Sequence, residues 1–268
     1  AVAAVFLAGL CWAFAMTRRT LTPGAVTAPS GEARSGSNCD VIRSRDLWLL
    51  AFYLFAKYGS QVAFQGLWGV PYIASVYGVS PTTAAGAITM LAVGYVAAAP
   101  MVGKLADVMA ARGMNLMAAQ RRLLIATTLL YVATWVPIVL APGFLPLSAM
   151  YVLLFVMGIS VSSASLVFGI AKDLFPANVS GFAIGLVNIT SILGGAAMPP
   201  IVGWFIDRLT AAGLQGAAVY SRALVPCLVA AAAGLALISM VGRSPGRHMP
   251  PPSYPAQSVA DSPSSRAA

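Results

Sequence analysis

The sequence contains few charged residues, and this scarcity indicates the solvent in which the protein folds. Only 9% of its 268 residues are charged, whereas 59% are hydrophobic; a soluble domain carries about 25% charged residues. A soluble fold of this composition would expose large apolar patches and aggregate, whereas a lipid-facing surface has no such problem. We therefore expect an all-α integral membrane protein, in which each crossing helix needs about 20 mostly apolar residues.

Several kinds of functional site lack the residues that would build them. The chain has one histidine, His248, and three widely separated cysteines without a C-x-x-C pair, so we expect no metal site, no disulfide framework and no cofactor. It also lacks the H-E-x-x-H and G-x-x-x-x-G-K-[ST] sequences, which argues against an enzyme and against an ATP-driven pump. The net charge of +9 comes from basic residues scattered over loops and tail. Nucleic acid is therefore not an expected partner.

Six apolar stretches long enough to cross a bilayer divide the chain into segments. We expect a flexible cytoplasmic loop at 17–46, a six-helix transmembrane bundle at 47–242 and a disordered cytoplasmic tail at 243–268. Residues 1–16 are apolar but short for a span and lack a basic n-region, so we interpret them as the end of a truncated helix. The expected spans are 47–76, 83–102, 123–140, 147–170, 180–206 and 222–241.

The basic residues gather on one alternating set of loops, which predicts the orientation. The other set holds only Arg208 and Arg222. Cytoplasmic loops carry the excess of Lys and Arg, so we place the loop at 17–46 and the C-terminus on the cytoplasmic side of the cell membrane (inner or plasma membrane). The basic residues of this side are Arg18, Arg19, Arg34, Arg43, Arg45, Lys104, Arg112, Arg121, Arg122, Lys172, Arg243, Arg247 and Arg266.

Two motifs resemble those of the major facilitator superfamily. The first, GKLADVMAARG, resembles the cytoplasmic G-x-L-a-D-r-x-G-r-r motif between the second and third helices of each half of such a transporter, although Val108, Ala110 and Ala111 depart from it. The resemblance implies a conformational latch formed by Gly103, Asp107 and Arg112. A glycine permits close helix packing, and an acidic residue at a helix end can pair with basic residues or with a helix N-terminus.

The second motif runs from Phe168 to Arg208 and resembles the family's tenth-to-eleventh helix region. It has an acidic-hydrophobic-Pro loop and then a Gly-rich helix that ends in G-x-x-x-D, with glycines at spacings that permit close helix approach. Six spans behind a long basic loop are also typical of the family's second half. The resemblance extends over about residues 1–242 and implies a missing N-terminal helical half as partner. The matching residues are Asp173, Pro176, Gly181, Gly185, Gly194, Gly195, Pro200, Gly203 and Asp207.

Lys57 is the charged residue that lies deep inside an expected span, so it needs a partner or a wet cavity. Gln61, Gln65, Trp68 and Tyr72 follow at helical spacing and predict one cavity-lining face with it. On this interpretation Lys57 supplies a point charge for an anionic solute, and the two glutamines supply hydrogen bonds. Two alternatives stay open: a charge pair with the missing half, and snorkelling of Lys57 towards the interface.

Asn188 lies on a Gly-rich part of the fifth span, where it either faces the cavity or bonds a neighbouring helix. No expected full span holds Asp or Glu at depth, so proton coupling cannot be inferred from this chain. We predict a secondary active transporter that moves a small anionic organic solute across the lipid bilayer by alternating access. Its predicted solute-binding residues are Lys57, Gln61, Gln65, Trp68 and Asn188. The alternative is a transporter-like membrane sensor that binds a solute and signals without transport.

Overall fold

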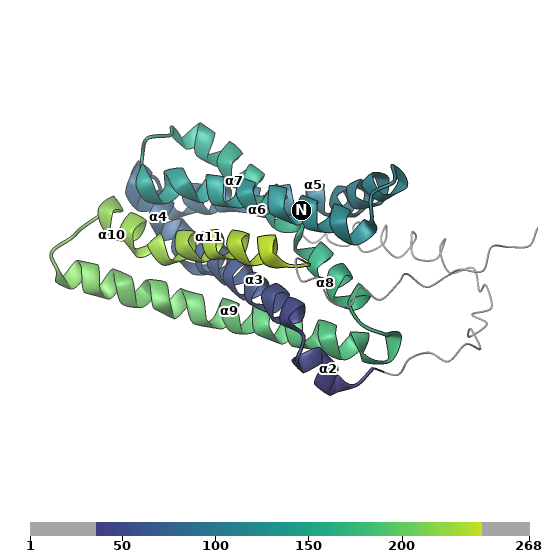
Figure 1. The fold of residues 1–268 in the computed structure, drawn as a ribbon. Helices are drawn as coiled ribbons and strands as arrows, with labels where there is room; N and C mark the ends of the chain where they lie inside the picture. Colours follow the sequence, from purple (N-terminus) through teal and green to yellow (C-terminus); the bar gives the residue numbers. More distant parts are fainter. Residues whose placement is uncertain (1–35, 243–268) are drawn as a thin grey trace, which may run out of the picture. The chain divides into compact units, whose positions relative to one another are not determined.

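The computed structural model describes residues 36–242; residues 1–35 and 243–268 lie outside the described part. The predictions for the truncated helix, for most of the basic loop and for the tail therefore concern residues outside it. The described residues form packed helices joined by short turns (Figure 1). The elements are α2 (Asn38–Ile42), α3 (Arg45–Val62), η1 (Ala63–Trp68), α4 (Gly69–Tyr77), α5 (Pro81–Ala111), α6 (Leu116–Leu140), α7 (Leu147–Ser162), α8 (Ala164–Asp173), α9 (Ala177–Ala211), α10 (Ala217–Ala223) and α11 (Val225–Met240).

The helices confirm the prediction of an all-α membrane fold. Within the described residues, five helical segments are long and apolar enough to cross a membrane. The first predicted span, 47–76, is also helical, but it is divided into α3, η1 and α4, and α3 carries Arg45, Asp46 and Lys57. The five segments are α5, α6, α7 with α8 (Leu147–Asp173), α9, and α10 with α11 (Ala217–Met240).

Several helices extend beyond the apolar runs that predicted them. The spans predicted at 83–102 and 123–140 leave a polar loop between them, at 103–122. The extent of this loop is wrong, because α5 continues to Ala111 and α6 begins at Leu116. The extra residues are mostly alanine, leucine, methionine and lysine, which favour helix in water as well as in lipid. The turn begins where Gly113 adopts a positive φ of 93°. The Asn115 side chain then caps α6 by accepting a hydrogen bond from the Met117 N–H at 2.9 Å.

Part of the predicted flexible loop 17–46 is folded, so that prediction is wrong over residues 38–42, which form α2. A capping box between Ser37 and Asp40 starts this helix. The Asn178 side chain holds the segment against the beginning of α9: its Nδ2 donates to the Gly36 carbonyl at 2.8 Å, and its Oδ1 accepts from the Gly36 N–H at 3.3 Å. Residues 36–42 are thus attached to the bundle at α9 as well as through α3.

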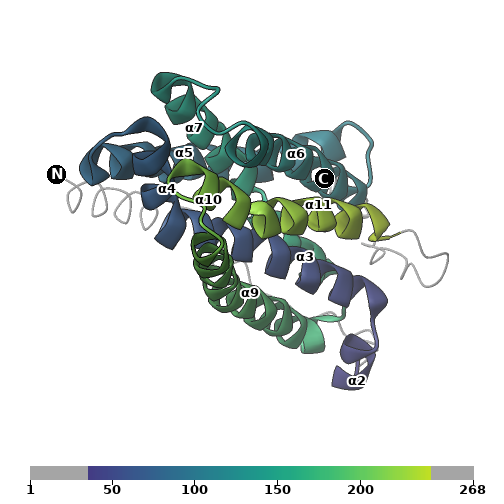
Figure 2. The ribbon, with the colours of Figure 1, turned by 90° about the vertical axis from the view of Figure 1, so that its left-hand side faces the viewer.

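Two helix crossings bring backbones into direct contact. In the first, α3 packs on α9, and a Cβ built on Gly59 would lie 2.7 Å from the Gly194 carbonyl oxygen. In the second, α5 packs on α7, where Gly94 and Gly158 meet each other's helix backbone. Figure 2 shows these pairs, with α9 beside α3 and α7 beside α5. Any side chain at these four positions would push the paired helices apart.

The two crossings are related by an internal repeat. Gly94 and Gly194 are 100 positions apart (194 − 94), and Gly59 and Gly158 are 99 apart (158 − 59). The sequence G-x-x-x-D recurs with the same shift, at residues 103–107 and 203–207. Among the described residues, each repeat contains three long helical segments: α3 to α4, α5 and α6 in the first, and α7 to α8, α9 and α10 to α11 in the second.

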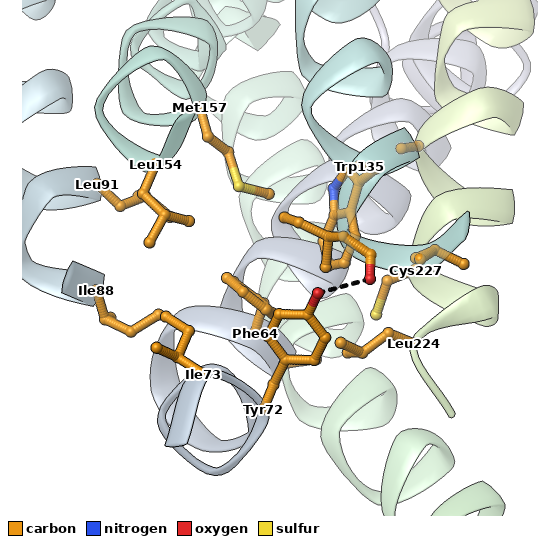
Figure 3. Close-up of a cluster of buried hydrophobic side chains, with 14 of the residues drawn as sticks. Phe64, Tyr72, Ile73, Ile88, Leu91, Trp135, Leu154, Met157, Leu224 and Cys227 are labelled. Atoms are coloured by element: carbon orange, nitrogen blue, oxygen red, sulfur yellow. Dashed lines mark hydrogen bonds between the residues drawn. The ribbon is translucent and has the colours of Figure 1, made fainter. Parts of the chain in front are cut away.

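The core consists of two clusters of buried hydrophobic side chains, one on either side of a polar layer around Lys57. Tyr53 belongs to one cluster and Tyr131 to the other. Figure 3 shows the cluster that contains Phe64, Tyr72 and Trp135, in which the Tyr72 hydroxyl donates to the Ile138 carbonyl at 2.8 Å. These clusters fix the helices whose other faces form the candidate site.

Candidate solute-binding site

A pocket of about 420 Å³ opens between the two crossed helix pairs. Its walls come from α3 and η1 with α9 on one side, and from α5 with α7 and α8 on the other. Seven of the lining residues are polar, and the others are aliphatic apart from Phe168. A concave, mostly apolar site with a few polar groups is typical of small-molecule binding. The polar lining residues are Tyr58, Gln61, Gln65, Tyr95, Ser165, Asn188 and Ser191.

Three of the predicted binding residues lie together in this pocket. Gln61 and Gln65 are joined by a hydrogen bond in which the Gln61 Nε2 donates to the Gln65 Oε1 at 3.1 Å. Asn188 was predicted either to face the cavity or to bond a neighbouring helix; in the structure it lies on α9 and lines the pocket. Each amide retains donors and acceptors, so the three can bind a solute that has both kinds of group.

Lys57 lies outside the pocket lining. Its side chain is only 1% exposed, and its Nζ donates to the Tyr53 hydroxyl at 2.9 Å and to the Ser160 carbonyl and the Ser163 Oγ, each at 3.1 Å. The rings of Tyr53 and Tyr131 lie 5.4 and 5.7 Å from the ammonium. The ammonium is thus enclosed by α3, α6 and the α7–α8 junction, neither in the cavity nor at an interface.

The predicted single face from Lys57 to Tyr72 is therefore wrong, and the π-helix η1 helps to explain why. A turn closed by i→i+5 bonds rotates the residues after it relative to those before it. Trp68 turns to α9, where its Nε1 donates to the Pro199 carbonyl at 3.0 Å. Tyr72 is buried in the hydrophobic cluster of Figure 3. The pocket instead receives Tyr58, Gln61 and Gln65 from this segment.

Of the three predicted latch residues, Gly103 and Asp107 lie on the last turns of α5 and Arg112 is its C-cap. Gly103 faces open space, since a Cβ there would meet no atom of the described residues within 4 Å. Close packing at Gly103, and likewise at Gly181 and Gly185, is therefore not found within this part of the chain. Asp107 and Arg112 are exposed. The latch remains a prediction.

Four polar residues of the pocket, Tyr58, Tyr95, Ser165 and Ser191, were not among the predicted binding residues. Tyr58 follows the lysine that sequence reasoning preferred, and Ser191 lies one turn after Asn188. Ser165 belongs to a serine-rich stretch that looks like helix packing, and packing does account for Ser160, Ser162 and Ser163, all buried. In the sequence, Tyr58 precedes Gln61 by three positions, a helical spacing that can place both on one face. Lys57 precedes Gln61 by four positions, so this spacing alone does not show which of the two lines the pocket.

Most of the chain matches the model of a known protein family. The model of the Major Facilitator Superfamily matches residues 47–263. The match begins at the start of the first predicted span, includes every predicted span and continues past α11. It therefore differs at both ends from the range of about 1–242 expected from the motifs. No individually curated protein matches the chain.

Proposed function

Because the chain belongs to the major facilitator superfamily, a family of membrane transporters, we propose that this protein is a secondary active transporter that moves a small polar organic solute by alternating access. The observation that carries this proposal is the pocket between the two crossed pairs, where Gln61, Gln65 and Asn188 converge. Two helix pairs in backbone contact are units that can move as rigid bodies. A missing N-terminal helical half would complete the pathway.

The polar groups of the pocket suggest how the solute is recognised. Among the described residues the lining contains amides, phenols and hydroxyls but no charged side chain. The prediction of an anionic solute relied on Lys57 as a point charge in the cavity. The Lys57 ammonium instead directs its three N–H donors to acceptors of the protein. We therefore assign recognition to hydrogen bonds, and this half does not require a negative charge on the solute.

The orientation is part of the same proposal. The ends of α3, α5 and α8 at or beside Arg45, Arg112 and Lys172 would face the cytoplasm, and the turn at 141–146 would face the opposite side of the cell membrane. The latch residues Asp107 and Arg112 would then lie on the cytoplasmic face, where a second half can reach them.

Solute uptake by the full-length protein in liposomes tests the proposal. The assay uses a panel of labelled polyols, amides and organic anions, and we expect saturable uptake of at least one compound. Gln61→Leu or Asn188→Leu should reduce uptake about tenfold or more, since each removes a hydrogen-bonding group from the site. The matched control is Gln215→Leu, because Gln215 is exposed in the turn between α9 and α10.

Two outcomes would contradict the proposal. The absence of flux for every compound would count against transport, and binding without flux would favour the sensor alternative. Equal loss of uptake in Gln215→Leu would show that the pocket residues have no special part in recognition.

A further inference from the structure

The junction between α7 and α8 is held in place by a residue of a different helix. The helix stops at Ser162 and starts again at Ala164, with Ser163 as the cap of both segments. We infer that Lys57 is a positioning residue, which fastens α8 against α3 and thereby sets the two walls of the solute pocket. This inference rests on the proposed transport function.

The ammonium of Lys57 matches the junction group for group. A protonated lysine has three donors, and three acceptors lie within 3.1 Å of Nζ: the Tyr53 hydroxyl on α3, the Ser160 carbonyl on α7 and the Ser163 Oγ between α7 and α8. Two of these acceptors belong to the interrupted turn itself. Lys57 therefore binds the backbone and a side chain where the helix changes course.

Two further hydrogen bonds tie α6 to the same junction and to the Tyr53 hydroxyl on α3. The Thr127 Oγ1 lies 2.7 Å from the Ser163 Oγ, and the Thr128 Oγ1 lies 2.8 Å from the Tyr53 hydroxyl. Three helical segments thus converge on one nitrogen atom and its acceptors. A network of this kind restrains the helices more strongly than apolar contacts, because each hydrogen bond has one preferred geometry.

The charge of Lys57 has no carboxylate partner among the described residues. Its surroundings there are the hydroxyls of Tyr53 and Ser163, the Ser160 carbonyl and the rings of Tyr53 and Tyr131. Replacing a buried charge by an apolar side chain of similar size is often neutral or stabilising. Packing alone would therefore be served as well by methionine, and the polar contacts indicate a role in holding the junction.

The fastened junction lies directly beside the pocket. Gln61 follows Lys57 by one turn of α3, while Ala164 and Ser165 follow Ser163, and all three line the pocket. A solute that contacts Gln61 and Ser165 therefore touches both sides of the joint. When the α7–α8 junction moves away from α3, the bonds from Nζ to Ser160 and Ser163 must break, so Lys57 controls how easily the pocket opens there.

Cysteine labelling of the full-length protein tests this role without a known solute. The reporter is Ala171→Cys on α8, a fully buried position, in a background without other cysteines and with N-ethylmaleimide as the probe. Lys57→Met should raise its labelling rate about tenfold or more, because two charge-assisted hydrogen bonds no longer oppose opening of α8. Ser163→Ala, which removes one acceptor, should give an intermediate increase.

Two controls distinguish local opening from unfolding. The native Cys227 on α11 is also fully buried; as the single cysteine of a second background, its labelling should not change in Lys57→Met. Lys172→Met, which removes an exposed lysine of α8, should leave both rates unchanged. Unchanged labelling of Ala171→Cys in Lys57→Met, or an equal rise at both reporters, would overturn the inference.

The labelling result does not depend on the uptake assay, so the two failures are distinguishable. If no solute is transported but the α8 reporter opens selectively, the positioning role holds and the transport proposal fails. For a solute that is transported, Lys57→Met should raise KM about tenfold while Vmax changes by less than about threefold, because the pocket walls lose their alignment. An unchanged KM together with an unchanged reporter would leave Lys57 as a packing residue.

Discussion

Tyr72 illustrates how one side chain compensates for a neighbour's missing donor. In a regular helix the Ile138 carbonyl would accept from the N–H four residues later, but residue 142 is a proline and has none. The Tyr72 hydroxyl donates to that carbonyl instead, at 2.8 Å. The end of α6 and the middle of α4 are therefore joined at a point where the helix alone would leave a buried acceptor unpaired.

Removing this hydroxyl should destabilise the protein without changing its packing. Tyr72→Phe leaves a buried carbonyl unsatisfied, which costs about 1–3 kcal/mol. We expect a lower Tm in detergent, measured by the fluorescence of a thiol- or tryptophan-based probe. Tyr151→Phe is the control, since its hydroxyl bonds to the Thr83 carbonyl at an exposed site; an equal drop in both variants would contradict the explanation.

The choice between Lys57 and Tyr58 marks the limit of prediction at this scale. Both residues precede Gln61 at a helical spacing, by four and by three positions. The cost of a buried charge correctly predicts that Lys57 needs polar partners. Two of its three hydrogen-bond acceptors, on Ser160 and Ser163, come from a segment more than 100 residues away in the sequence, so the sequence does not identify them. Periodicity predicts Gln61 and Gln65 as pocket residues because the wide polar face, rather than one register, contains them. Asn188 was predicted separately, from its place in a Gly-rich part of the fifth span.

At the scale of helices, the crossing of α5 and α7 depends on the absence of side chains. Gly94 and Gly158 lie where each helix meets the backbone of the other. Elsewhere on α5, Gly86 faces the Tyr151 hydroxyl, and a Cβ built there would lie 3.5 Å from it, an ordinary contact. Two glycines on one helix therefore have opposite roles, one required by packing and one replaceable.

Alanine substitution should separate these roles. Gly94→Ala should destabilise by about 2 kcal/mol or more, since the crossed helices must separate. Gly86→Ala should stabilise by up to about 1 kcal/mol, because alanine is the better helix former. Thermal unfolding in detergent measures both, and destabilisation by Gly86→Ala of the same size would refute the close-crossing explanation.

Helix existence was predictable from the sequence, but helix ends were not. Apolar runs of about 20 residues predict the spans because the bilayer demands them. The same rule misplaces the end of α5, since the polar residues after 102 continue as helix until Gly113. The π-helix η1 had no signal in composition, and α2 forms in a basic stretch because Ser37 caps it and Asn178 holds it.

The attachment of α2 to α9 can be tested with a single side chain. Asn178→Ala removes both hydrogen bonds to Gly36, so residues 36–44 should become more sensitive to a protease added to the full-length protein. Ser180→Ala is a suitable control, because the Ser180 hydroxyl bonds within its own helix to the Ala177 carbonyl. Equal cleavage of all three proteins would show that the two bonds do not hold the segment.

For the whole molecule, the alternation of the loops makes a prediction about sidedness. Cys39 is exposed before α3, and Phe144 is 81% exposed in the turn between α6 and α7. In inverted vesicles, a membrane-impermeant maleimide should label a single cysteine at 39 but not Phe144→Cys, and right-side-out vesicles should give the reverse. Labelling of both positions from one side would contradict the topology.

The pocket's position between two crossed pairs also bears on how its selectivity can change. The backbones of α3 and α9, and those of α5 and α7, already touch, so trimming a nearby side chain cannot bring either pair closer together. Each pair consequently presents a wall with a nearly fixed backbone, while the side chains that project from that wall into the pocket are free to vary. Adaptation to a bulkier or differently shaped cargo would then proceed by trimming Tyr58, Tyr95 or Phe168 rather than by loosening the scaffold.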